Sequence, residues 1–283
     1  MSPMAVARDR RDTVSGVADA PVVRFEHVAL AFDDKVVLED VSFTLAKGHT
    51  VIILGASGSG KSTTLKIITG LLRADSGSVW VNGKRIDRLT EQEMMPVRAD
   101  LGMIFQEGAL FDSLTVRENV GYKLYEESDM PLEQVHRRVE EVLGFVGLGE
   151  HIDKMPSELS GGQRRRVAIA RAMAFKPQIL LYDEATTGLD PITATTVDDE
   201  IIKLRDLEEV SSIVVTHQLR DAFYVATHMA VRSVDGSVQI VPASAEKTAE
   251  TEFIMLKDGL VHFEGDAESL RHSTDEYLQT FLS

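Results

Sequence analysis

The stretch GASGSGKST at residues 55–63 has the residue types and spacing of a phosphate-binding loop. Its glycines let backbone N–H groups wrap around phosphate oxygens, and the start of the helix that follows adds positive potential. Lys61 is expected to reach the β- and γ-phosphates of a nucleotide, and the Ser62 hydroxyl to bind Mg²⁺. A chance glycine-rich turn is the structural alternative, which the Lys-Ser pair and the strand-to-helix context argue against. The residues of this phosphate loop expected to contact nucleotide are Gly55, Ser57, Gly58, Ser59, Gly60, Lys61, Ser62 and Thr63.

Two adjacent carboxylates, Asp183 and Glu184, end the apolar run ILLYDEA. Phosphoryl transfer needs one acid that holds Mg²⁺ and one group that orients or deprotonates water. Because adjacent side chains at a strand end can diverge, we expect Asp183 to bind the metal and Glu184 to act on the water. His217 ends another apolar run, at the sheet edge where ligands bind in open α/β folds. Such residues often end strands for structural reasons, and the phosphate loop favours the functional interpretation.

A second turn suited to an anion lies far downstream, where Ser160, Gly161 and Gly162 open a basic helix. The N–H groups of this Ser-Gly-Gly turn could hold a phosphate. The segment inserted between the two turns is expected to keep them from sharing one nucleotide within one chain. A symmetric dimer, in which each turn closes over the partner's nucleotide, would give both turns a use. An ordinary helix start is the structural alternative.

The composition of the 283 residues narrows the classes of protein that fit. A net charge of −15 argues against a nucleic-acid partner, because nucleic-acid binders normally present a basic surface. The absence of cysteine excludes disulfides, zinc–thiolate sites and cysteine nucleophiles. No apolar run approaches the ~18 residues of a membrane span, and residues 1–20 lack the apolar centre of a signal peptide. We therefore expect a cytoplasmic protein with a flexible tail over residues 1–20.

The elements around these motifs alternate between strand and helix. Residues 50–56, before the phosphate loop, form a continuous apolar run of the kind found in buried parallel strands. Asn82-Gly83 predicts a tight hairpin. The alternation predicts an α/β domain with a parallel sheet. The other expected strands cover residues 22–32, 36–48, 179–185 and 211–217, and the expected helices cover residues 61–72 and 193–207.

Three segments depart from this alternation. Residues 92–174 are expected to form an inserted region of helices and loops, since apolar residues recur there at helical spacing. Residues 234–252 are polar and rich in small residues, which predicts a hairpin or loop insertion. Residues 271–283 are expected to form a C-terminal helix.

Taken together and in this order, these motifs resemble the ATP-binding subunit of ABC transporters. The resemblance rests on the phosphate loop, Gln106, LSGGQ at residues 159–163, Asp183-Glu184, TTGLDP at residues 186–191 and His217. It covers the domain at residues 21–270. It implies a P-loop NTPase (RecA-like) α/β core with an antiparallel β subdomain and an inserted α-helical subdomain. It also implies ATP and Mg²⁺ as cofactors, and a homodimer that encloses two ATP molecules.

The same resemblance implies roles for individual residues. Phe32 would stack on adenine, and Gln106 would sense Mg²⁺ and couple to the membrane partner. Asp190 would cross the dimer interface. The metal ligands would be Ser62, Gln106 and Asp183, and the catalytic residues Glu184 and His217, with His217 at the γ-phosphate. The residues that would reach the partner's ATP are Ser160, Gly161, Gly162, Gln163 and Asp190.

A narrower resemblance is to the ATPases of Mla/Mce-type phospholipid transport systems. It rests on residues 105–124, FQEGALFDSLTVRENVGYKL, with MPSELSGGQRRRVAIARA and TTGLDPIT. It implies a multi-span permease, an Mce-domain lipid-binding protein, a possible small regulatory subunit, and a peripheral place on the cytoplasmic face of the inner membrane. The alternatives are the ATPase of an amino-acid or methionine importer, and a non-transport ABC ATPase.

Overall fold

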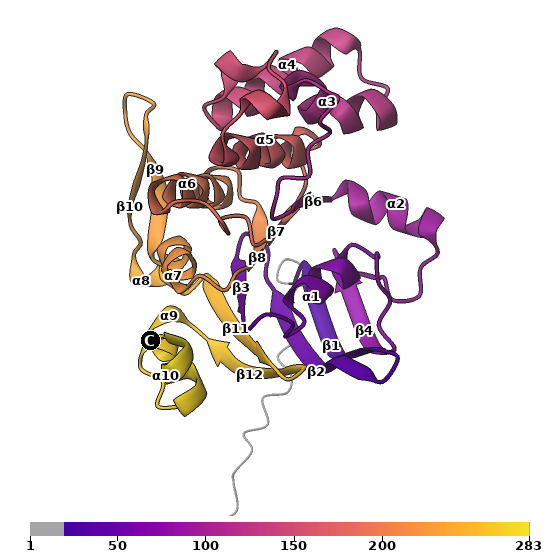
Figure 1. Ribbon diagram of the computed structural model, residues 1–283, viewed down its shortest axis with the longest axis vertical. Helices are drawn as coiled ribbons and strands as arrows, with labels where there is room; N and C mark the ends of the chain where they lie inside the picture. Colours follow the sequence, from indigo (N-terminus) through magenta and orange to yellow (C-terminus); the bar gives the residue numbers. More distant parts are fainter. Residues whose placement is uncertain (1–19, 283) are drawn as a thin grey trace, which may run out of the picture.

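The computed structural model describes residues 20–282, so the tail expected over residues 1–20 lies, except for its last residue, outside the described range. Ten of the described strands form one mixed sheet (Figure 1). Their order across it is β5 (Lys84–Arg85), β4 (Ser76–Val81), β1 (Val23–Phe32), β2 (Lys35–Leu45), β12 (Leu260–Gly265), β11 (Thr251–Lys257), β3 (Thr50–Leu54), β8 (Ser211–Val215), β7 (Ile179–Asp183) and β6 (Leu101–Ile104).

The sheet has a parallel part and an antiparallel part. Strands β11, β3, β8, β7 and β6 run parallel to one another, whereas β1, β2, β4 and β5 pair antiparallel with one another. Between the two parts, β12 pairs antiparallel with β11 and parallel with β2. Asn82 and Gly83 form the expected tight turn between β4 and β5, both with positive φ. The expected α/β class with an antiparallel β part is therefore confirmed.

Strand β3 is apolar throughout because both of its faces are covered. Ile52 and Leu54 belong to the hydrophobic cluster on one face of the sheet, and Val51 and Ile53 to the cluster on the other. The described helices of five or more residues are α1 (Lys61–Ile68), α2 (Glu91–Ala99), α3 (Val116–Glu127), α4 (Leu132–Phe145), α5 (Gly161–Ala174), α6 (Pro191–Leu207), α7 (Leu219–Thr227), α9 (Ala267–Arg271) and α10 (Glu276–Leu282).

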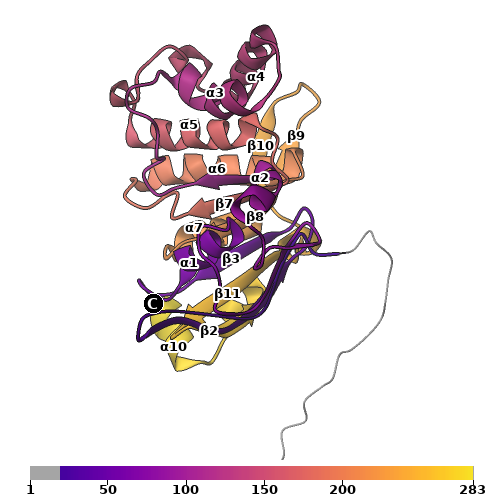
Figure 2. The same ribbon diagram turned by 90° about the vertical axis from the view of Figure 1, so that its right-hand side faces the viewer.

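The helices lie in layers against this sheet. Helix α1 contributes to the cluster that includes Val51, and α3 to α7 contribute to the cluster that includes Ile52. Figure 2 shows α5 and α6 side by side, with α3 and α4 beyond α5, away from β1 and β2. The Ser-Gly-Gly turn at the start of α5 is thereby carried by the helical layers rather than by the sheet.

Two segments differ in detail from the expected elements. The segment 92–174 contains β6, which pairs with β7 and extends the sheet, in addition to helices and loops. The C-terminal helix expected over residues 271–283 is α10, which covers only Glu276–Leu282, and a separate helix, α9, ends at Arg271. The Asp275 carboxylate accepts a hydrogen bond from the Leu278 N–H, which starts α10 as a separate helix.

The insertion after α7 is a two-stranded sheet followed by a short helix. Strands β9 (His228–Arg232) and β10 (Val238–Pro242) pair antiparallel, and α8 (Ala245–Thr248) follows. The hairpin expected at residues 234–252 therefore begins before residue 234, and Thr251 already lies in β11. The end of α6 holds the insertion, because the Asp206 carboxylate accepts bonds from the Ala230 N–H and the Lys247 ammonium.

The buried carboxylate of Asp198 on α6 makes the stability of the fold pH-dependent. Burial, followed by the charge of Asp221, raises the pKa of Asp198 to about 8. The folded chain therefore binds a proton at Asp198 that the unfolded chain releases near pH 4. This contribution to stability is complete below the unfolded-state pKa and is lost as the pH rises through about 8.

We expect the free energy of unfolding to fall by roughly 1 kcal/mol per pH unit, from this group alone, between about pH 5 and 7. In Asp198→Asn the slope should be smaller, because the amide does not titrate. Urea unfolding of both proteins at several pH values measures the difference. Equal slopes would contradict the raised pKa of Asp198.

Candidate functional site

The phosphate loop joins β3 to α1 in a conformation that needs glycine. Gly55 has φ of +149°, and a Cβ there would lie 2.4 Å from the Leu256 carbonyl oxygen. Gly60 has φ of +100° and precedes the first residue of α1 with no side-chain cap. The first N–H groups of α1 are therefore left for a ligand, which is how helix N-termini bind anions.

Lys61 folds back onto the loop that it belongs to. Its ammonium donates to the carbonyls of Gly55 at 2.8 Å and Ala56 at 3.1 Å, and lies 3.8 Å from the Glu184 carboxylate. The side chain is 5% exposed, and this burial lowers the pKa of Lys61 against the opposing charges of Glu184 and Asp183. A phosphate in the loop would give this buried cation an anionic partner.

Ser62 and Asp183 form a small oxygen cluster at the end of β7. The Ser62 hydroxyl donates to the Asp183 carboxylate at 2.7 Å. Burial raises the pKa of Asp183, and the bond from Ser62 only partly opposes this. A hydroxyl and a carboxylate are hard oxygen ligands of the kind that Mg²⁺ takes beside nucleotide phosphates, and Gln106 lines the same cavity. The residues present therefore fit a magnesium ion.

Glu184 meets His217 because β7 and β8 are neighbouring parallel strands. The His217 Nδ1 and the Glu184 Oε2 are 3.1 Å apart. The Thr187 hydroxyl donates to the same oxygen at 3.1 Å. Glu184 has a positive φ of 51°, and its N–H bonds to the Val215 carbonyl. A positive φ is a strained backbone conformation for a glutamate, and the other carboxylate oxygen, Oε1, lies 3.8 Å from the Lys61 ammonium.

One cavity of about 690 Å³ gathers most of the predicted site. Phe32 lines the cavity and is 47% exposed, so its ring is accessible for stacking. Gly55 and Ser59 do not line this phosphate-loop cavity, and the buried Ser59 hydroxyl has no hydrogen-bond partner in residues 20–282. The lining residues are Phe32, Lys35, Val37, Ser57, Gly58, Gly60, Lys61, Ser62, Thr63, Gln106, Asp183, Glu184, Thr187 and His217.

The residues expected to serve a partner lie outside this cavity. Ser160 caps α5, with its hydroxyl accepting from the Gln163 N–H at 3.3 Å. Asp190 caps α6 through the Ile192 and Thr193 N–H groups. A Cβ on Gly162 would lie 2.1 Å from the Thr193 methyl group, so α5 and α6 start in close contact. The Ser-Gly-Gly turn and Asp190 are therefore separated from the phosphate-loop cavity of their own chain.

Sequence reasoning missed three residues of the cavity: Lys35, Val37 and Thr187. Lys35 and Val37 alternate along β2 just after Phe32, and this placement was the only sequence signal for them. Thr187 lies three residues after Glu184. The Thr187 hydroxyl reaches the Glu184 carboxylate because the positive φ of Glu184 turns the chain.

Thr187→Val is expected to lower kcat for ATP hydrolysis about 5-fold, with KM nearly unchanged. The methyl group keeps the volume but removes one bond that orients the Glu184 carboxylate. Steady-state phosphate release measures the effect, and Thr187→Ser, which keeps the hydroxyl, is the matched control. A parental kcat in Thr187→Val would show that the Glu184 carboxylate does not need this bond.

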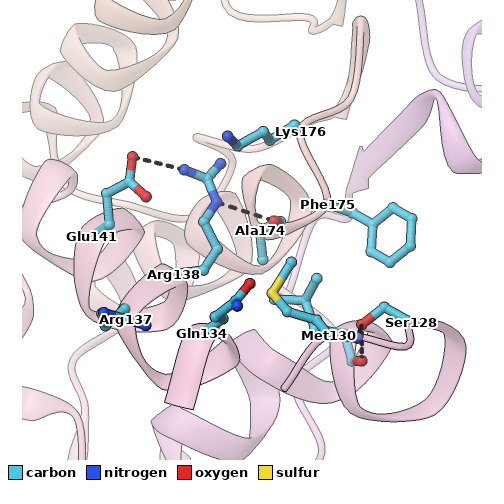
Figure 3. A pocket seen from close by; sticks show the side chains of 10 residues that line it. Ser128, Met130, Gln134, Arg137, Arg138, Glu141, Ala174, Phe175 and Lys176 are labelled. Atoms are coloured by element: carbon cyan, nitrogen blue, oxygen red, sulfur yellow. Dashed lines mark hydrogen bonds and ion pairs between the residues drawn. The ribbon is translucent and has the colours of Figure 1, made fainter. Parts of the chain in front are cut away.

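A second cavity, of about 370 Å³, lies between α3, α4 and the end of α5 (Figure 3). None of the predicted site residues lines it. Arg138 lines this cavity. Its guanidinium donates to the carbonyls of Met173 and Ala174 and pairs with Glu141. These bonds satisfy the last carbonyls of α5, so Arg138 has a structural role there.

Comparisons with known proteins identify related sequences and structures. A family model described as ABC transporter matches residues 38–187. The chain is 43% identical over 214 residues to protein TRIGALACTOSYLDIACYLGLYCEROL 3, chloroplastic, of Arabidopsis thaliana, over 70% of this chain and 61% of that one. It is 37% identical over 274 residues to the methionine import ATP-binding protein MetN of Bifidobacterium longum, over 93% and 68%. The chain thus spans less than two thirds of the first relative's length.

Solved structures give the same result. MJ0796, a bacterial ABC transporter cassette solved as a dimer, superposes with a TM-score of 0.71 at 30% identity, over 86% of this chain and 98% of that one. The same cassette has also been solved as a dimeric post-hydrolysis state bound to ADP and Pi. The family model, the relatives and the structures agree, and this chain belongs to the ABC transporter family.

Proposed function

We propose that the chain binds Mg²⁺ and ATP in the phosphate-loop cavity and hydrolyses ATP there. The observation that carries this is the convergence of Lys61, the Ser62–Asp183 pair and the Glu184–His217 pair on one cavity. Magnesium, when bound, would neutralise charge on the phosphates. Glu184 would orient and deprotonate the attacking water, and His217 would hold Glu184 and contact the γ-phosphate.

We propose further that hydrolysis takes place in a homodimer. The Ser-Gly-Gly turn and Asp190 lie outside the cavity of their own chain, which favours a role at a partner's nucleotide. The dimeric solved structures of MJ0796 support this arrangement. Binding of two ATP molecules would close the dimer, and hydrolysis would reopen it.

The membrane partner is also a proposal. No helix within residues 20–282 has the length and apolar character to cross a bilayer. We propose that the chain sits at the cytoplasmic face of a membrane permease and that Gln106 couples the cavity to it. This proposal is supported by relatives whose names describe methionine import and glycine betaine/carnitine transport.

For the cargo, the comparisons favour the methionine-import alternative over the lipid reading. Several relatives, at 37–42% identity, are named methionine import ATP-binding proteins. We propose import of methionine or a similar small solute as the first candidate. Phospholipid transport with an Mce-domain partner is the second candidate, favoured by the 43% identity to the relative named for trigalactosyldiacylglycerol.

The deciding experiment is affinity purification of the Glu184→Gln variant from detergent-solubilised source membranes with Mg·ATP. Co-purification of a permease with a solute-binding protein specific for methionine would support the first candidate. A permease with an Mce-domain protein and bound phospholipid would support the second. Recovery of nucleic acid or ribosomes without any membrane protein would overturn the transport function.

A further inference from the structure

His151 is connected to the Ser-Gly-Gly turn through the side chain of Gln163. It ends the 3₁₀ turn Gly149–His151, and its Nε2 lies 2.9 Å from the Gln163 Nε2. The other end of the Gln163 amide, Oε1, accepts a bond from the Ser160 N–H at 2.9 Å. We propose that His151 is a positioning residue that fixes the Ser-Gly-Gly turn through Gln163, and thereby sets how well the turn closes on a partner's nucleotide. This inference rests on the proposed dimeric ATPase.

The direction of these bonds follows from the chemistry of the groups. A backbone N–H can only donate, so the Gln163 amide must present its oxygen to Ser160. Its NH₂ group then points at His151, and the His151 Nε2 must accept. In this arrangement the His151 Nε2 therefore carries no hydrogen. A donor at the Nε2 position would oppose the Gln163 NH₂ and disfavour the arrangement.

The bond matters because glutamine has three rotatable side-chain bonds. Without the acceptor on His151, the Gln163 side chain gains rotamer freedom and leaves the Ser160 N–H more often. Ser160 and Gln163 form a reciprocal capping box, since the Gln163 N–H also donates to the Ser160 hydroxyl. Loosening one half of the box frays the first turn of α5. The N–H groups of that turn are the ones that would meet the partner's phosphate.

Substitution of His151 is expected to leave the fold intact. The backbone bonds of His151, to Leu148 and from Lys154, do not involve its ring. The ring Nδ1 is buried and has no partner within residues 20–282, so truncation removes an unpaired polar group rather than a second bond. The cost of truncation should therefore appear at the Ser-Gly-Gly turn.

The test uses the full chain in the Glu184→Gln background, in which ATP-bound dimers should persist. Sedimentation velocity with Mg·ATP measures dimerisation, and a fluorescent ATP analogue added to dilute monomer measures binding at the chain's own cavity. We expect His151→Ala to weaken dimerisation about 10-fold, because each dimer contains two affected turns. Affinity for the analogue should stay within about 2-fold.

Two further variants separate positioning from general destabilisation. His151→Gln can place a carbonyl oxygen where the ring Nε2 lies, and it should restore dimerisation to within about 3-fold of the background. His136→Ala, on α4, removes a ring that packs edge-on against Tyr125 and should have no effect on dimerisation. Undiminished dimerisation of His151→Ala would overturn the inference, and so would an equal loss of dimerisation and analogue binding. A background variant that stays monomeric with Mg·ATP would overturn the proposed dimer itself.

Discussion

Replacing Glu184 with glutamine is expected to lower kcat for ATP hydrolysis about 10³-fold while nucleotide binding is retained. The amide cannot accept a proton from water, which removes general-base catalysis. Its oxygen can still accept the bond from the Thr187 hydroxyl, and its size preserves the cavity. Phosphate release at saturating Mg·ATP and the Kd for nucleotide together measure the effect.

Glu39→Gln is the matched control for this variant. Glu39 is an exposed residue of β2 and does not line the phosphate-loop cavity. Its substitution should leave both kcat and Kd at parental values. Hydrolysis by Glu184→Gln at the parental rate would remove Glu184 from the role of base and would require another group to orient the water.

Arg205→Ala is expected to lower the free energy of unfolding by about 3–5 kcal/mol. Arg205 is 2% exposed. Its guanidinium donates to both Asp206 oxygens and to the carbonyls of Val225 and His228. Truncation would leave these buried acceptors without their donor, and the Asp206 carboxylate would keep only the Ala230 N–H and Lys247.

Denaturant unfolding measures this loss, with Arg232→Ala as the control. Arg232 lies in β9 of the insertion that Arg205 contacts, but it is exposed, so its truncation should change stability by less than about 0.5 kcal/mol. The β9–β10 hairpin should also lose amide-exchange protection first in Arg205→Ala. A loss below about 1 kcal/mol would mean that water replaces Arg205 at Asp206.

The sequence was most informative where one residue type is required by local geometry. The glycines of the phosphate loop, Lys61 and the carboxylates at the end of β7 could be predicted because strand, turn and helix leave few alternatives. The central strands could be predicted because burial on both faces demands continuous apolar runs, as β3 shows.

Other features depend on conditions that no local pattern records. Strand β6 has only four residues, too few to show a hydrophobic period in the sequence. It is stabilised by pairing with β7. The bond from Thr187 to Glu184 needs a positive φ in a glutamate, which residue preferences disfavour. His151 gave no sequence signal, because its contact with Gln163 depends on how the 3₁₀ turn folds onto α5.

The close contact between Gly162 and Thr193 has a consequence for how two chains would meet. The starts of α5 and α6 touch where only a hydrogen atom fits, so the Ser-Gly-Gly turn and Asp190 are joined within one chain. Arg165 of α5 adds to this contact by donating to the carbonyls of Ala185 and Thr187, in the segment that leads into α6. In the proposed dimer, each subunit would thus bring a preassembled half-site, and little conformational entropy would be lost on closure. A dimer of this kind can separate and re-form in every turnover without rebuilding either face.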